Sequence, residues 1–192
     1  TEPIAVALAV AKAMEIIEEH CSPAASWKSE EGYSLEIAVS GNILKNGMGV
    51  GIPGTGMVGL HIASALGAVC GRSSYGLEVL HDLNEAAIIC AKKMVADKRV
   101  SVGLAETSHK LYVKASVIYD GHCSHAVIQD DHDRIIETCM DGEVLSSSAS
   151  KETAVSQDLK TTLDYHLTVK EIVDFASEVP LEDIEFILES RT

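Results

Sequence analysis

The sequence predicts an α+β fold, with a helical lobe that carries a Gly-rich loop, an antiparallel β-sheet lobe and a C-terminal helical tail. Apolar residues recur at helical spacing up to residue 98, alternate with polar residues over 99–145, and return to helical spacing near the end. We therefore expect a helical lobe over 1–98, a β-meander over 99–145, a linker over 146–167 and a helical tail over 168–192.

The first lobe begins with a predicted helix from Ile4 to Glu19, for which Thr1 is a suitable N-cap and Pro3 a suitable first-turn residue. The predicted elements that follow are a strand over 34–40, a helix over 60–69 and, after a predicted capping box of Asp82 and Glu85, a helix over 84–97.

Four strands are predicted in the second lobe, over 100–104, 111–119, 124–129 and 134–140. Asp-Gly pairs at 120–121 and 141–142 predict tight hairpin turns, which favours an antiparallel meander. A Ser- and Thr-rich stretch follows. A capping box of Thr168 and Glu171 then predicts a helix that ends before Pro180, and a last helix is expected over 181–190.

Composition excludes several classes of function. The formal charge is -14, from 15 basic and 29 acidic residues, which argues against a nucleic-acid partner. The longest apolar run, Ile4 to Met14, contains Lys12 and is too short for a membrane span, and no secretory leader is evident. The five cysteines are widely spaced and form no CxxC pair, so we expect a reducing, cytoplasmic location.

Half of the 14 glycines lie between Gly41 and Gly59, which predicts unusual backbone or close contact with a ligand. Two overlapping G-x-G-x-x-G patterns occur there, but no buried strand precedes Gly49 and Pro53 interrupts the segment. A dinucleotide site is therefore rejected. A Walker A loop is excluded because no Gly-Lys-Ser/Thr follows.

The run from Ser40 to Thr55, SGNILKNGMGVGIPGT, resembles the signature block of the L-cysteine desulfidase family, which is related to the alpha chain of iron–sulfur L-serine dehydratases. Three further segments resemble the same family in the same order: Thr1–Ala5, Gly76–Leu80, and Lys114–Ala115 with His132–Ile135. The resemblance covers residues 1–144 well and the tail loosely.

This resemblance implies a carbon–sulfur lyase with a [4Fe-4S] cluster held by three cysteines, whose open iron binds the substrate. L-cysteine would lose sulfide by β-elimination, and the aminoacrylate would hydrolyse to pyruvate and ammonia. An L-serine dehydratase and a non-catalytic amino-acid-binding or scaffold module are the alternatives.

The family's first cluster ligand precedes the Thr-Glu-Pro segment, and the others lie in a Cys-rich C-terminal segment that this sequence lacks. We therefore expect a fragment of the full-length enzyme that holds no cluster and is inactive alone. Its expected partners are a small amino-acid substrate and the remaining part of its own polypeptide. Exposed apolar faces are also compatible with a homo-oligomer.

Ten residues form the predicted site, and no metal ligand is expected among them. Each has a structural alternative. Thr1 and Glu2 would then serve as helix caps, the glycine segment would pack a helix against a strand, and His132 would be a surface residue of a hairpin turn. The general base is left open between Lys45 and His132. The catalytic candidates are Lys45, His132 and Glu2, and the substrate-binding candidates are Thr1, Ser40, Gly41, Asn42, Asn46, Gly54 and Thr55.

Overall fold

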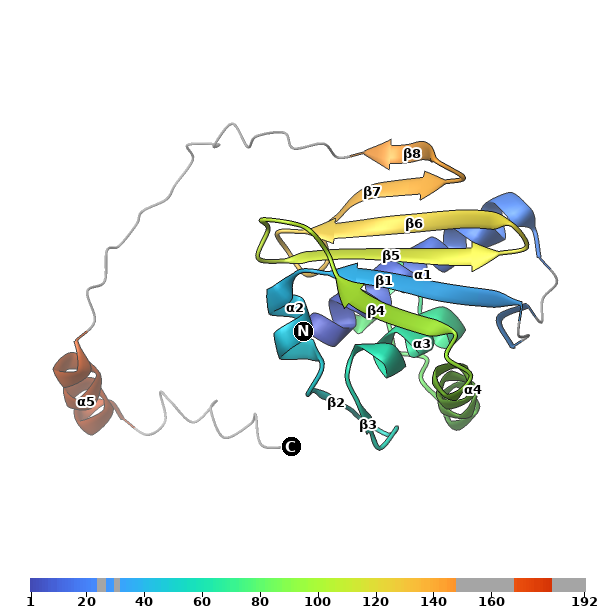
Figure 1. Cartoon of the computed structure of the whole chain (residues 1–192). Helices are drawn as coiled ribbons and strands as arrows, with labels where there is room; N and C mark the ends of the chain where they lie inside the picture. Colours follow the sequence, from blue (N-terminus) through green and yellow to red (C-terminus); the bar gives the residue numbers. More distant parts are fainter. Residues whose placement is uncertain (24–26, 30–31, 148–167, 181–192) are drawn as a thin grey trace. The chain divides into compact units, whose positions relative to one another are not determined.

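The computed structural model describes residues 1–23, 27–29, 32–147 and 168–180, which have an α+β fold as the sequence predicts (Figure 1). The chain divides into two compact units, Thr1–Lys151 and Glu152–Thr192. All candidate site residues lie in the first unit.

A six-stranded sheet in the order β4-β1-β5-β6-β7-β8 forms one layer of the first unit. β1 and β4 are parallel, whereas every other neighbouring pair is antiparallel. The strands are β1 (Tyr33–Val39), β4 (Val100–Leu104), β5 (Tyr112–Tyr119), β6 (His122–Gln129), β7 (Ile135–Met140) and β8 (Glu143–Ser147).

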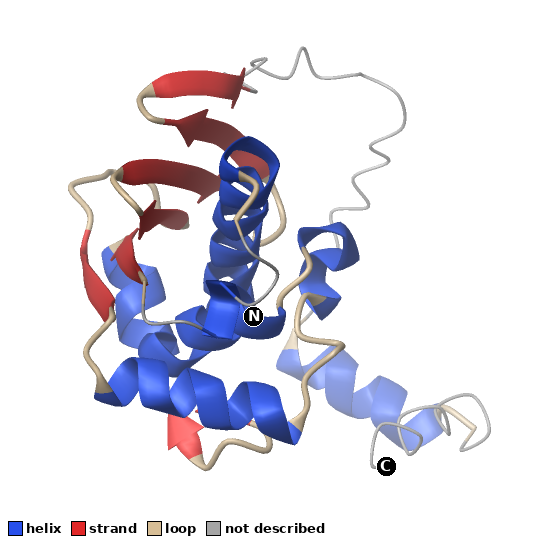
Figure 2. Cartoon of the chain, turned by 90° about the vertical axis from the view of Figure 1, so that its right-hand side faces the viewer, coloured by secondary structure: helices blue, strands red, loops and turns tan. Residues whose placement is uncertain are grey.

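The helical layer is centred on α1 (Glu2–Cys21), which packs on β5 and β6, while α3 (Leu60–Cys70) covers its other side (Figure 2). α4 (Glu85–Ala96) packs in turn on α3. Because α1 lies between two layers, almost every residue from Ala5 to Ile17 is buried. The smaller elements are η1 (Trp27–Ser29), α2 (Gly41–Gly47), β2 (Gly51–Ile52), β3 (Met57–Val58) and η2 (Ser73–Glu78).

α1 and α3 cross with their backbones in close contact. A Cβ atom at Gly67 would lie 2.5 Å from the carbonyl oxygen of Ala7. Real Cβ contacts are longer than this, and the obstructing atom belongs to the backbone of a buried helix, which cannot easily move. Glycine is therefore required at position 67.

The arrangement of the strands differs from the two predicted lobes. β1 comes from residues 1–98, the predicted helical lobe, yet it lies in the sheet between β4 and β5. The expected division at residue 98 has no counterpart, since strand pairing joins both segments into one sheet. Sequence periodicity identifies strands but carries no information about which strands pair.

Three local predictions also change. The predicted glycine loop contains a short helix, α2, and the β2–β3 hairpin. β8 extends into the expected linker, of which 148–167 lie outside the described residues. The α4 cap is Asn84, whose Oδ1 accepts the Ala87 N–H at 3.0 Å, while Asp82 pairs with Arg72 at 2.8 Å.

In the second unit, α5 (Val169–Glu178) starts at the predicted capping box. The Thr168 hydroxyl accepts the backbone N–H of Glu171, whose carboxylate accepts the backbone N–H of Thr168. The helix predicted over 181–190 lies outside the described residues. Among the described helices, none combines the length and the apolar character needed to cross a membrane.

A Gly67→Ala substitution tests the close helix crossing. We expect it to lower the free energy of unfolding by about 2 kcal/mol, because the added methyl group collides with the Ala7 carbonyl. Urea unfolding measures this change. Gly49→Ala is the matched control, since a Cβ there meets nothing within 4 Å, and equal stability of the two variants would contradict the crossing.

Candidate functional site

The first turn of α1 and the last turn of α2 meet, and this contact joins two segments that are far apart in the sequence. The Asn46 side-chain amide donates to the Glu2 carboxylate, with Nδ2 3.3 Å from Oε1. Two of the predicted site residues are thus brought together.

α2 holds Asn46 in place through its buried side. Ile43 is buried, and a Cβ at Gly47 would overlap the Leu60 side chain, so α2 lies directly against the start of α3. The glycine at position 47 therefore serves packing rather than ligand contact.

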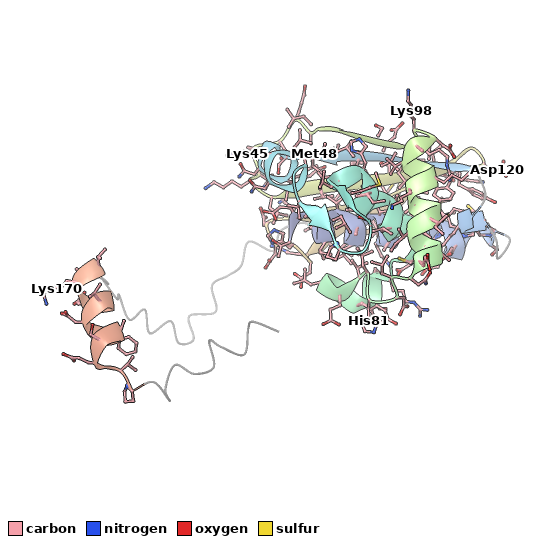
Figure 3. All side chains as sticks on the ribbon, turned by 90° about the horizontal axis from the view of Figure 1, so that it is seen from below. Lys45, Met48, His81, Lys98, Asp120 and Lys170 are labelled. Carbon is pink, nitrogen blue, oxygen red and sulfur yellow. The ribbon has the colours of Figure 1, made fainter. Side chains whose placement is uncertain are left out.

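The outer face of α2 carries three predicted site residues, Asn42, Lys45 and Asn46, at the spacing that places helical side chains on one face. All three are exposed, and within the described ranges Lys45 has no hydrogen-bond or ion-pair partner. Figure 3 places Lys45 at one end of the unit and Asp120 at the opposite end. The outer face of α2 can therefore present one cation and two amides to a ligand.

Glu2 is a carboxylate held in its charged form. A hydrogen bond from its own backbone N–H, and then one from the Asn46 amide, lower the pKa of the Glu2 carboxyl below its usual value. Thr1 is the N-cap of α1, but its hydroxyl donates to Glu2 Oε2 at 3.3 Å and makes no capping bond. The Glu2 carboxylate therefore stays charged, and the N-terminal ammonium group of this chain lies 3.4 Å from its Oε2.

Two predicted substrate-binding hydroxyls have structural partners instead. Ser40 is buried, and its hydroxyl donates to the Lys110 carbonyl at 2.8 Å. Thr55 is also buried, and its hydroxyl donates to the Ile52 carbonyl at 2.7 Å and accepts the Met57 N–H at 3.0 Å. These hydroxyls fix the end of β1 and the β2–β3 hairpin.

The two predicted glycines, Gly41 and Gly54, lie in different settings. Gly41 is the first residue of α2, and a Cβ there would make only ordinary contact with Leu104, at 3.8 Å. Gly54 has a φ of 78° in the β2–β3 turn, a conformation that favours glycine. The turn itself explains the glycine at position 54.

His132 lies in the turn between β6 and β7, where its backbone N–H donates to Asp131 Oδ1 at 3.0 Å. The turn follows the end of β6 that pairs with Tyr112, and the Tyr112 carbonyl accepts the Ser40 N–H at 2.9 Å. His132 is thus at the same end of the sheet as α2. Within the described residues, no hydrogen bond or ion pair joins it to Glu2 or Lys45.

An apolar hollow of about 410 Å³ lies beside the start of α1. Thr1 is at its edge, and part of the glycine segment forms one wall. The predicted site did not include its second wall, which comes from the mixed apolar and charged run after Gly76. The apolar lining includes Ile4, Val50, Ile52, Pro53, Leu80 and Leu83.

A polar hollow of about 440 Å³ lies toward the other end of α1 and contains none of the predicted site residues. Its charged groups largely pair with one another. Arg72 Nε lies 2.8 Å from Asp82 Oδ2, and Lys28 Nζ lies 3.0 Å from Glu18 Oε1. These pairs hold the wall of the hollow together.

The residues of this chain do not fit the donor set of a [4Fe-4S] cluster. All five cysteines are free, and they lie on five different elements, α1, α3, α4, β6 and β7. Among the residues with described positions, no group of three or more His, Cys, Asp or Glu could hold a metal ion.

Several relatives are named UPF0597 protein. The relative from Shewanella halifaxensis is 39% identical over 192 residues, which are 100% of this chain and 43% of the relative. That from Parabacteroides distasonis is 43% identical over 190 residues (99% of this chain, 41% of the relative), and that from Caldanaerobacter subterraneus is 40% identical over 190 residues (97% and 41%).

The chain spans about two fifths of the length of these curated relatives. Their names state no reaction, so the desulfidase resemblance stays a prediction. No family model matches the sequence. No solved structure matches it either.

Asn46→Ala tests the contact between α1 and α2. We expect the pKa of Glu2 to rise, because a donor that favours the charged carboxylate is lost. Asn46→Asp should raise it further, since a second negative charge then faces Glu2. Carbon-detected NMR titration measures both shifts. Asn42→Ala is the control, and an unchanged pKa in Asn46→Asp would contradict the contact.

Ser40→Ala tests the structural role of the Ser40 hydroxyl. We expect a loss of about 1 kcal/mol in the free energy of unfolding, because the Lys110 carbonyl loses its donor. Denaturant unfolding measures the loss. A fully stable variant that had lost binding of an amino acid would show instead that the hydroxyl serves a ligand.

Proposed function

We propose that this chain forms part of a [4Fe-4S]-dependent L-cysteine desulfidase and supplies the surface that orients the amino-acid substrate. The observation that carries the proposal is the hydrogen bond between Asn46 and Glu2. It joins two of the segments that resemble that family, the start of the chain and the glycine segment.

The charges around this contact suit an amino acid. The Glu2 carboxylate can pair with the substrate's α-ammonium group, and the exposed Lys45 ammonium with its carboxylate. Asn42 and Asn46 add amide groups on the same face of α2. Together these groups can orient L-cysteine through its main-chain atoms and leave its side chain free to react.

The proposed reaction is a β-elimination. A base removes the Cα proton, the Cβ–S bond breaks as the C=C bond forms, and the sulfur leaves as sulfide. The aminoacrylate product then takes up water and yields pyruvate and ammonia. Lys45 and His132 are the two candidates for this base, and a Lys45 ammonium that holds the substrate carboxylate leaves the role to His132.

The cluster would supply Lewis-acid chemistry when bound, and its ligands must come from polypeptide outside this sequence, since the cysteines present do not fit. We also propose a cytoplasmic location, because five free cysteines suit a reducing compartment.

The first experiment uses the Shewanella halifaxensis relative, to which all 192 residues of this chain align. The relative is purified without oxygen, supplied with iron and sulfide, and given L-cysteine or L-serine. We expect sulfide and pyruvate in equal amounts from L-cysteine. Pyruvate from L-serine alone would indicate a dehydratase, and no product from either would indicate a non-catalytic module. Both results contradict the proposal.

A chimera tests whether Glu2 and Lys45 contribute to activity toward L-cysteine. This sequence replaces the matched part of the relative, and Glu2→Gln and Lys45→Met are introduced one at a time. We expect each variant to lower kcat/KM for L-cysteine at least tenfold, as lost charge-assisted contacts do. Glu143→Gln, an exposed change on β8, is the matched control and should retain full activity. Full activity of Glu2→Gln would remove Glu2 from the site.

A further inference from the structure

The apolar hollow beside the start of α1 continues into an exposed apolar rim. Val50 lines the hollow and is 38% exposed, and the nearby Met48 is 39% exposed. Leu80 and Leu83 form the opposite wall. Among the residues that the structure describes, no ionisable side chain lines the hollow, so the lining favours an apolar occupant.

Gly51 in the wall of this hollow is not explained by the fold. Its φ lies outside the left-handed region, and a Cβ at this position would meet nothing within 4 Å. Gly47 and Gly67, in contrast, are forced by neighbouring atoms. Gly49 and Gly103 share these two properties, but of the three only Gly51 is in the lining of this hollow, where the missing side chain leaves room for something that approaches from outside.

The relatives indicate a source for the polypeptide that would occupy the hollow. More than half of each curated relative lies outside the matched region, since the match covers only 41 to 43% of the relative. Each relative therefore has further polypeptide that is available to pack against the part that corresponds to this chain. The hollow has the apolar lining that a buried interface core requires.

We propose that the hollow is a docking site for a polypeptide segment from that remaining part, which inserts aliphatic side chains between Val50 and Leu83 and brings its backbone close to Gly51. The segment would then lie beside Thr1 and Glu2 and cover the start of α1. This inference concerns packing, and it holds whatever reaction the assembled protein performs.

The test is binding in trans. Circular dichroism first establishes that the part of the Shewanella halifaxensis relative outside the match folds on its own. That part is then mixed with the 192-residue chain, and calorimetry and sedimentation measure the complex. We expect a one-to-one complex. Gly51→Leu places a side chain in the hollow at a position where the Cβ meets nothing within 4 Å, and it should weaken binding at least tenfold, as should Val50→Asp.

The matched controls make the same changes elsewhere on the surface. Gly103→Leu is on β4, where a Cβ also meets nothing within 4 Å, and Ile89→Asp is on α4, where the side chain is 63% exposed. Both should bind within twofold of the unsubstituted chain, and thermal unfolding should show that all four variants fold.

Three outcomes would overturn the proposal. The first is the absence of any complex with the unsubstituted chain. The second is equal binding by Gly51→Leu and Gly103→Leu. The third is a dimer of this chain alone that Gly51→Leu dissociates, which would make a second copy the occupant. If the chimera lacks desulfidase activity while the docking interaction is intact, the proposed reaction is contradicted and the docking proposal is not.

Discussion

The burial of α1 between the sheet and α3 is the constraint on which the rest of this structure depends. A helix covered on both sides must be apolar around most of its circumference, with charged residues such as Lys12 and Glu15 confined to a partly exposed strip, and it must be narrow where another helix crosses it. Alanines along α1 and Gly67 on α3 meet this requirement. The same packing fixes the start of α1, and with it Glu2, against the α2 residue Asn46.

Much of the fold could be predicted because periodicity is a local property of the sequence. α1, β1, α3 and the meander strands lie close to their predicted ranges. The pairing of β1 with β4 and β5 could not be predicted, since it depends on tertiary contacts between distant segments. α2 was also missed, because a seven-residue helix with a glycine at each end gives little helical signal.

The candidate site was predicted only in part. Residue types suggested that Ser40, Thr55 and Asn46 have equal claims to bind a substrate. The structure separates them, because the two hydroxyls are buried and bonded to backbone carbonyls, whereas the Asn46 amide is exposed beside Glu2. Burial and hydrogen-bond partners are three-dimensional properties, so sequence alone could not make this distinction. The second wall of the hollow, Leu80 and Leu83, was invisible for the same reason.

The central claim is that the start of α1 and the outer face of α2 form the surface on which an amino acid binds. The most direct measurement is an NMR titration of this chain with L-cysteine under reducing conditions, which follows backbone and side-chain amide signals. The account predicts saturable shifts at Glu2 and at the Asn46 side chain, with none on α4. Shifts centred on Arg72 and Asp82 in the polar hollow, or none at the start of α1, would contradict it.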